Sequence, residues 1–501
     1  MSRKACISIF LSWMVVSLAC DRGAEQNILA RVGSHDITVE EFRARFALTP
    51  YFAQFPSADP QTRILVLASL IGEKMLAEEA VARGLDQTDR FSAIYTQLKK
   101  EAVIEKLLND LFSNVAVSPE EIQEGLRKSQ RVLEVQELIF DTREEAELVK
   151  RKLDASKSLL NGSGQPEENL QQASTYSIKW GDSEPEVEEV LWNLKVGQTS
   201  QPVLFKKHYY LFKIASEQLS FPSRDDLLTL QPQIKSKIER LKKRQIYDAF
   251  FRNLMSGKRT RVPAARLRAI AEQLEQVLDI PPATATDTTH FRPILMSEDT
   301  YLRASYSLEN RLDETFITFD DGSLWTIADF LRNLRHGPYP LNYASRGLFR
   351  ASLRNMAITM MEQEYVAREG IRRGLDKSAY VREEVQTWMD SYLADQMRLE
   401  IIASVAERSR SSSSANGSDG SAAKDHPSKS ERVMALDDYL SGAVDKFNIE
   451  VNKPVLDTLS VDHLNMMVFK RHFPGRQAAP AILPLDRLQK YFSKVYGKIT
   501  E

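Results

Sequence analysis

The sequence predicts an α+β protein that is mostly helical, with two related helical lobes and one small β-α-β domain inserted into the first lobe. Three observations lead to this expectation. Apolar residues recur at helical spacing along much of the 501-residue chain. A strand, a turn and a capped helix near residue 30 return near residue 320. The strand-like alternation of apolar and polar residues is concentrated between residues 130 and 217.

The composition excludes several classes of protein. Lys and Arg number 67 against 69 Asp and Glu, whereas proteins that bind nucleic acid normally carry a basic surplus. The two cysteines are Cys6 and Cys20, so the rest of the chain offers no thiol for a disulfide, a zinc site or a nucleophile. The seven histidines show no metalloprotease-type pairing, and the sequence has no phosphate loop or dinucleotide fingerprint. We therefore expect no nucleic-acid partner, no metal and no cofactor.

Residues 1–19 have the pattern of a signal peptide. A positively charged start precedes a short apolar stretch that ends in Leu18-Ala19-Cys20. This ending resembles a bacterial lipobox, which implies lipidation of Cys20 and a membrane tether for a protein of the cell envelope. The small residues Ser17 and Ala19 also fit ordinary signal cleavage, so plain secretion is the alternative.

The first helical lobe is expected over residues 20–129. After a short strand and a turn, Thr38 with Glu41 three residues later predicts a capping box at the start of a helix. Asp59-Pro60 predicts the start of a longer helix, because Asp is a good N-cap and Pro is favoured at the first helical position. Gly84 can end that helix, and a second long helix follows it.

The same order of features is expected again over residues 313–408. Thr326 is the predicted N-cap there, with Asp329 in place of the glutamate, which predicts a weaker capping box. The spacing is kept between the two copies, because Phe42 and Phe330 stand 288 residues apart while Gly84 and Gly374 stand 290 apart. The alternative is that any two pairs of helices look alike.

Each copy is expected to close with a return helix and a short extended piece. Residues 247–267 match residues 436–456 at an offset of 189, so the first copy holds about 100 more residues in its middle. In the second copy the middle is a Ser- and Gly-rich run, which predicts a disordered linker. The expected divisions after residue 129 are an inserted domain (130–217), the return helix of the first lobe (218–270), a connector (271–312), the second lobe (313–408), the linker (409–431), and a return helix with the C-terminal segment (432–501).

The inserted domain has a distinct order of elements. A capping box with Pro at the first helical position opens it at Ser118-Pro119-Glu120-Glu121. The pattern then predicts a strand at 132–140, a helix at 143–154, a second helix at 185–194, and a turn followed by a hairpin at 194–216. This order resembles a parvulin-type peptidyl-prolyl isomerase domain.

The most specific part of the resemblance is the run from Leu194 to Val203, which is similar to the Leu-x-x-Gly-x-x-Ser-x-Pro-Val run of that family. Together with the flanking helical patterns, residues 28–262 resemble the SurA, PrsA and PpiC-like foldases of bacteria. The second helical copy, at about 315–460, lacks the insert.

The resemblance implies a site on the strands of the inserted domain, where active relatives carry histidines. The first-strand position falls on Glu137 and the last-strand position on Tyr210, while His208 lies two residues earlier on the same face of the strand. We take these three as the candidate catalytic residues. The candidate substrate-binding residues are Leu138, Trp180, Trp192, Leu194, Val203 and Phe212.

The resemblance implies a foldase or chaperone for exported or outer-membrane proteins, with unfolded or extended polypeptides as clients. A carboxylate buried among apolar groups is costly to desolvate, so Glu137 predicts an isomerase that is weakly active or inactive. Two alternatives remain open at this point. The inserted domain is an active isomerase, or the chain is a lipid-anchored scaffold that binds a fixed partner.

Overall fold

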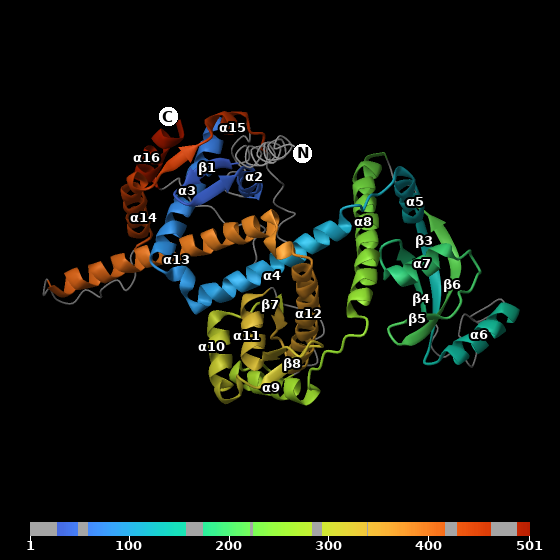
Figure 1. Ribbon diagram of the computed structural model, residues 1–501. Coiled ribbons are helices and arrows are strands. Elements are labelled where there is room, and N and C mark those ends of the chain that lie inside the picture. The colour runs from blue at the N-terminus through green and yellow to red at the C-terminus, as the bar shows by residue number, and fades with distance from the viewer. Residues whose placement is uncertain are drawn as a thin grey trace, which may run out of the picture. The chain divides into compact units, whose positions relative to one another are not determined.

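The computed structural model describes residues 28–48, 59–156, 174–220, 224–282, 293–337, 339–415, 428–461 and 488–500. This part of the chain is mostly helical with small sheets, as predicted (Figure 1). It forms two compact units: unit 1 is Met1–Leu107 with Gly257–Glu501, and unit 2 is Leu108–Ser256. The predicted signal peptide and Cys20 lie outside the described residues. Among the helices that are described, none is both long and apolar enough to cross a membrane.

The first half of unit 1 opens with an antiparallel hairpin and continues into helices. Its elements are β1 (Ile28–Val32), β2 (His35–Thr38), α2 (Val39–Leu48), α3 (Pro60–Ala82), the 3₁₀ turn η2 (Leu85–Gln87) and α4 (Asp89–Phe112). The predicted start of α3 is confirmed, because Asp59 accepts a hydrogen bond from the Gln61 amide and Pro60 is the first helical residue. Gly84 follows α3 with a φ of 73°, a left-handed value that favours glycine.

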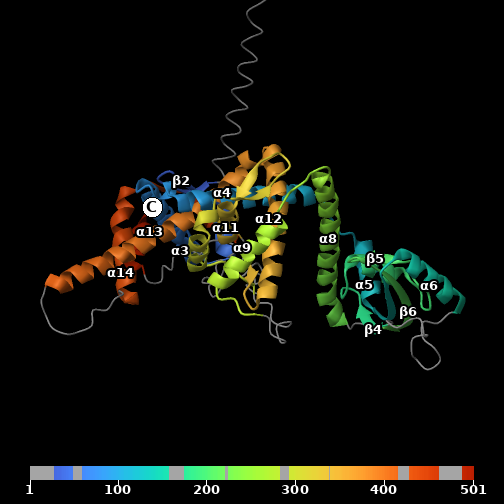
Figure 2. The same ribbon diagram turned by 90° about the horizontal axis from the view of Figure 1, so that it is seen from below.

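The second half of unit 1 begins after unit 2. Its elements are α9 (Ala264–Val277), β7 (Pro293–Ile294), α10 (Glu298–Ser307), η3 (Glu309–Arg311), β8 (Thr315–Thr318), β9 (Leu324–Thr326), α11 (Ile327–His336), β10 (Leu341–Asn342), α12 (Arg346–Arg372), η4 (Leu375–Lys377) and α13 (Ala379–Ala415). The helices α9, α11 and α12 gather together in both views (Figures 1 and 2). Gly374 ends α12 with a φ of 78°.

Of the two predicted capping boxes, the one expected to be weaker is the complete one. At Thr326 the box is complete, because the Asp329 amide donates to the Thr326 hydroxyl and the Asp329 carboxylate accepts from the Thr326 amide. At Thr38 the hydroxyl accepts from the Glu41 amide, but the Glu41 carboxylate accepts a hydrogen bond from Lys74 instead. The prediction of a weaker box at Asp329 is therefore wrong.

The C-terminal elements pack on the first half of unit 1. They are α14 (Lys429–Ala443), η5 (Val444–Lys446), β11 (Ile449–Val451), α15 (Lys453–Thr458) and α16 (Gln489–Thr500). The strand β11 pairs antiparallel with β1 and completes a three-stranded sheet in the order β11-β1-β2.

The linker predicted at 409–431 needs a correction at both ends. The helix α13 continues to Ala415, and α14 begins with a complete capping box between Ser428 and Glu431. Local helix signals therefore extend into the Ser-rich run from both sides. Residues 416–427 lie outside the described part.

Unit 2 contains a four-stranded antiparallel sheet in the order β4-β3-β6-β5. Its elements are α5 (Pro119–Ser129), β3 (Arg131–Phe140), α6 (Arg143–Ser156), β4 (Ser174–Lys179), α7 (Pro185–Asn193), β5 (Val203–Phe205), β6 (His208–Leu219) and α8 (Arg224–Met255). The predicted elements are present, and the capping box at Ser118 is confirmed. The strand β4 was not predicted, because STYSIK is polar and short.

The sheet of unit 2 has a hydrophobic cluster on each face. One cluster brings Leu133, Val135 and Ile214 of the sheet against Leu191 of α7. The other brings Leu138 and Leu211 against Ala146 of α6. Because successive side chains of a strand point to opposite faces, the odd-numbered residues of β3 from Leu133 onward share the α7 side.

Candidate functional site

The candidate site lies on the face of the unit 2 sheet that α7 partly covers. Glu137 on β3 stands opposite Phe212 on β6, and the next residue on this face, Ile139, stands opposite Tyr210. Along its other edge β3 pairs with β4, where Tyr176 stands opposite Val135. The sheet register therefore brings Glu137 and Tyr210, two of the predicted catalytic residues, to one face.

The Glu137 carboxylate is held by a tyrosine that the sequence did not indicate. The Tyr176 hydroxyl donates a hydrogen bond of 2.9 Å to Glu137 Oε2. Burial raises the pKa of Tyr176, and the hydrogen bond to Glu137 raises it further. The tyrosine therefore stays protonated and acts as a donor, while the carboxylate is the acceptor. Both side chains are half-buried.

Aromatic rings surround Tyr210 on the same face. Its ring stacks on Phe212 with centroids 5.8 Å apart and meets the edge of Phe205 at 5.9 Å. The tight turn from β5 into β6 positions Phe205, because Lys206 and Lys207 both adopt positive φ values there. The ammonium of Lys206 lies 4.7 Å from the centre of the Phe205 ring. The face thus offers apolar and aromatic surface beside one carboxylate.

His208 pairs with an aspartate beyond the end of β3. Its Nδ1 lies 3.0 Å from Asp141 Oδ1, at the exposed beginning of β6, and its side chain is 49% exposed. Asp141 directly follows β3. This pairing does not join His208 to Glu137 or Tyr176.

The run from Leu194 to Val203 is fixed against β6 by the backbone. The Gly197 amide donates to Ile214 O and the Ser200 amide donates to Phe212 O, both at 2.7 Å. The Ser200 hydroxyl in turn accepts from the Phe212 amide at 3.0 Å. Gly197 has a φ of 81°, which explains a glycine at this point of the run.

Most of the predicted substrate-binding residues serve as core. Trp192, Leu194 and Phe212 are buried in the cluster under α7, and the Trp192 indole donates to Lys128 O at 3.0 Å. Val203 is half-buried at the margin of that cluster. Leu138 needs a correction, because strand alternation places it on the opposite face, buried against α6.

Trp180 borders a cleft that the sequence did not reveal. The cleft has a volume of about 460 Å³ and is lined by residues of α5, α7 and α8, with Trp192 as a second tryptophan. The ammonium of Lys237 lies 3.6 Å from the centre of the Trp180 ring and 2.8 Å from Glu188 Oε2. This ion pair fixes α8 against α7 beside the cleft.

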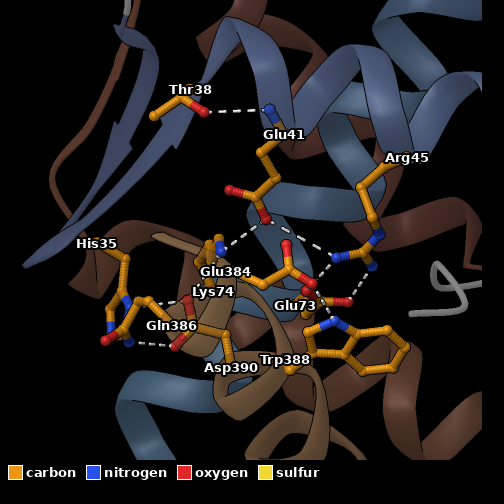
Figure 3. A network of polar contacts seen from close by, with 10 residues as sticks. All are labelled: His35, Thr38, Glu41, Arg45, Glu73, Lys74, Glu384, Gln386, Trp388 and Asp390. Carbon is orange, nitrogen blue, oxygen red and sulfur yellow. Dashed lines mark hydrogen bonds and ion pairs between the residues drawn. The ribbon is translucent and has the colours of Figure 1, made fainter. Parts of the chain in front are cut away.

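Unit 1 contains a buried network of charged residues that sequence reasoning also missed (Figure 3). Arg45 donates to both oxygens of Glu73, while Lys74 contacts Glu41 and Asp390, each at 2.8 Å. Further members or neighbours of the network are His35, Glu384, Gln386 and Trp388. The sequence signal was the charged pair Glu73-Lys74, which interrupts the apolar stretch in the middle of α3.

The pKa shifts in the network follow from its partners. Burial by itself lowers the pKa of His35, but the hydrogen bond and charge of Asp390 outweigh it and raise the pKa above its ordinary value. Burial by itself raises the pKa of Asp390, but Lys74 and His35 hold it below its ordinary value. The network therefore favours the charged form of both groups.

No group of His, Cys, Asp and Glu side chains within the described ranges has a geometry that could hold a metal ion. The sites above consist of hydrogen bonds, ion pairs and aromatic contacts.

No protein-family model matches the chain, and the comparison with curated proteins finds no match. Solved structures give likenesses at low identity. One, described among two SurA-like chaperones of Campylobacter jejuni, is 12% identical with a TM-score of 0.22, and the match covers 46% of the present chain and 97% of the other. A PrsA peptidyl-prolyl isomerase of Bacillus cereus is 16% identical with a TM-score of 0.19, covering 44% and 89%. The foldase PrsA of Streptococcus pneumoniae is 13% identical with a TM-score of 0.19, covering 42% and 86%.

Proposed function

We propose that the chain is a foldase or chaperone of the bacterial cell envelope that holds unfolded or extended segments of exported or outer-membrane proteins. In this proposal unit 2 contains a parvulin-like domain with little or no isomerase activity, and a lipid on Cys20 tethers the chain to a membrane. The sequence resemblance over residues 28–262 supports the proposal, as does the way Leu194–Val203 is fixed against β6.

The observation that carries the proposal is the hydrogen bond between Tyr176 and Glu137. Rotation about an X–Pro bond faces a barrier of about 18–20 kcal/mol, and an isomerase lowers it by stabilising the twisted amide better than the planar one. Because Glu137 Oε2 accepts the Tyr176 hydroxyl, this position offers a bound amide an acceptor rather than a donor. Such a group disfavours the reaction but leaves the surrounding aromatic surface able to bind a polypeptide.

The sheet of unit 2 also offers a way to hold an extended segment. Among the described strands, β4 and β5 are its edges. An extended chain can add to a sheet edge through backbone hydrogen bonds, while neighbouring apolar surface takes its side chains. This mode of binding suits clients of many sequences, because the backbone is common to all of them.

Two assays on the chain from residue 21 test the proposal. We expect it to suppress the aggregation of several unrelated unfolded proteins, and to leave a proline-limited refolding reaction unaccelerated. A chain that protects none of these clients, or only one of them, would instead be a scaffold for a fixed partner.

An active isomerase is the second candidate, favoured by the aromatic cluster of Tyr210, Phe205 and Phe212. In that case refolding accelerates, and the acceleration disappears when Tyr210 and His208 are both changed to Ala. Holding of clients should persist in that double variant under either candidate.

A further inference from the structure

We propose that unit 1 consists of two copies of one lobe that have exchanged their long helices, and that oppositely arranged ion pairs decide which helix each lobe accepts. The proposal concerns how the chain recognises itself and does not depend on the function proposed above. It identifies two helix-binding surfaces, on α3 and on α12, and assigns a different helix of the same chain to each.

The exchange is visible in the packing of the long helices. The helix α13 comes from the second half of the chain but packs along α3 of the first half, where Met397 and Leu393 join the core that contains Leu70 and Ile71. Figure 1 shows α13 crossing α3. In return, α4 of the first half meets α12 of the second, where Val103 lies against Gly370.

The return segments are exchanged in the same sense. Arg31 of β1 pairs with Glu450 of β11, which belongs to the return segment of the second half. Thr318 of β8 pairs with Arg261, which belongs to the return segment of the first half, through backbone hydrogen bonds of 2.9 and 3.0 Å. Arg261 and Glu450 stand at the offset of 189 that relates the two return segments. Both halves thus use the other half's strand in the same register.

The ion pairs at equivalent positions have opposite polarity. Lys74 on α3 contacts Asp390 on α13 at 2.8 Å, and Lys100 on α4 contacts Glu364 on α12 at 2.9 Å. Lys74 and Glu364 stand 290 residues apart, and so do Lys100 and Asp390. At the position where α3 of the first lobe carries a cation, α12 of the second lobe therefore carries an anion.

A third pair of equivalent positions follows the same rule. Glu78 on α3 accepts a hydrogen bond of 3.0 Å from the Ser34 amide, in the turn between β1 and β2. Arg368 on α12, 290 residues later, donates at 2.9 Å to Asp321 in the turn between β8 and β9. The reversal of charge between α3 and α12 thus extends one turn further along these helices.

The reversal disfavours a closed arrangement, in which each half of unit 1 folds back on itself. In that arrangement α4 would pack on α3, and α13 would pack on α12. Lys74 would then face Lys100, and Glu364 would face Asp390. Lys74 and Asp390 have exposed side-chain fractions of 1% and 0%, and Lys100 and Glu364 have 11% and 18%. Like charges brought together at such buried positions repel strongly and stay desolvated. The exchanged arrangement places an opposite charge on the partner helix at both positions, whereas the closed arrangement places a like charge there.

A disulfide can report the arrangement. The two cysteines of the chain lie within its first 20 residues, so the chain from residue 21 has none. A Cβ placed on Gly370 would lie 3.8 Å from the Cβ of Val103, which is a usual distance for a disulfide. Val103→Cys with Gly370→Cys should therefore form an intramolecular disulfide, seen as a faster-migrating monomer on a non-reducing gel.

The decisive variant transposes the charges of the two long helices. Lys100→Asp with Asp390→Lys leaves the net charge unchanged, but it makes both exchanged pairs repulsive and both closed pairs attractive. Added to the two cysteines, it should reduce the yield of intramolecular disulfide at least several-fold. The matched control is Lys106→Asp with Asp395→Lys, which moves the same charges on the same helices outside the reversed pairs and should keep the yield.

A second variant covers the case in which the transposed chain does not fold. Lys100→Glu with Glu364→Lys keeps an ion pair in the second lobe, but makes the closed and exchanged arrangements equally attractive. We expect it to fold with a disulfide yield below that of the reference, which is the double-cysteine chain without charge changes. A yield equal to the reference in this variant, or in a folded transposed variant, would overturn the proposal.

Discussion

His35 Nδ1 lies 3.2 Å from Asp390 Oδ2, although the two residues are separated by 355 positions in the chain. The contact joins β2 of the first half to α13, at one side of the buried network in Figure 3. Lys74 and Glu78 of α3 also act on His35, the first lowering its pKa and the second raising it. The contact therefore makes the packing of α13 on α3 sensitive to protonation.

The stability of unit 1 should depend on pH through His35. The pKa of His35 is raised in the folded state, so its contribution is complete below the unfolded value of about 6.5 and is lost as the pH rises through the folded value. Denaturant unfolding between pH 5.5 and 8.5 should show the free energy of unfolding falling with pH. His35→Gln should flatten that slope. An unchanged slope in the variant would mean that His35 does not titrate with folding.

Asp390 should show the opposite dependence. Its pKa is lowered in the folded state, so its contribution is present above the unfolded value of about 3.9 and is lost as the pH falls through the folded value. Asp390→Asn leaves the ammonium of Lys74 with less compensation in a buried place, and we expect a loss of about 3–5 kcal/mol of stability at neutral pH. The double variant Lys74→Met with Asp390→Leu should lose less than Asp390→Asn alone. A double variant that is less stable than the single one would contradict this account.

Introducing histidines on the sheet face of unit 2 should create isomerase activity. We expect Glu137→His with Tyr210→His to accelerate proline-limited refolding at least several-fold, because the carboxylate disappears and two neutral donors replace it. Glu134→His provides the control, since Glu134 lies on the same strand and accepts from the Ser216 hydroxyl instead. Equal acceleration by the control would point to a non-specific effect of histidine.

The two helix caps should differ in their energetic importance. Thr326→Ala removes a hydroxyl that accepts from the Asp329 amide and donates to the Asp329 carboxylate, while the backbone arm of the box remains, and it should cost about 1–2 kcal/mol of stability. Thr38→Ala removes only the hydrogen bond from the Glu41 amide to the hydroxyl, because the Glu41 carboxylate is already directed to Lys74, and should cost less. Denaturant unfolding of the two variants measures the difference. Equal costs would show that the amide–hydroxyl bond alone carries the cap.

Local signals predicted most of the secondary structure, because caps and strand alternation act over a few residues. Asp59-Pro60 and the box at Ser118 mark helix starts where the structure has them. The capping role expected of the Glu41 side chain failed, because a lysine on a different helix competes for its carboxylate. The strand β4 was missed because its residues are mostly polar, and its position depends on pairing with β3.

The candidate site was only partly predictable, for the same reason. Alignment with a family pattern led to Glu137 and Tyr210, which the sheet register does bring to one face. Nothing near Tyr176 in the sequence indicated a hydrogen bond across the strand to Glu137. The network around Lys74 and Asp390 could not be found from spacing either, since its members come from opposite ends of the chain.

The pairing of β1 with β11 has a consequence for the synthesis of the chain. Arg31 and its partner Glu450 are separated by 419 residues, so the ribosome needs about 20–80 s to deliver the second strand after the first. During that interval one edge of β1 remains unpaired, and for most of it the apolar face of α3 lacks α13. An unpaired strand edge recruits other extended chains. For that time the emerging protein is itself a substrate for the factors that protect nascent chains. Unit 1 can complete its packing only after the last quarter of the chain has been made.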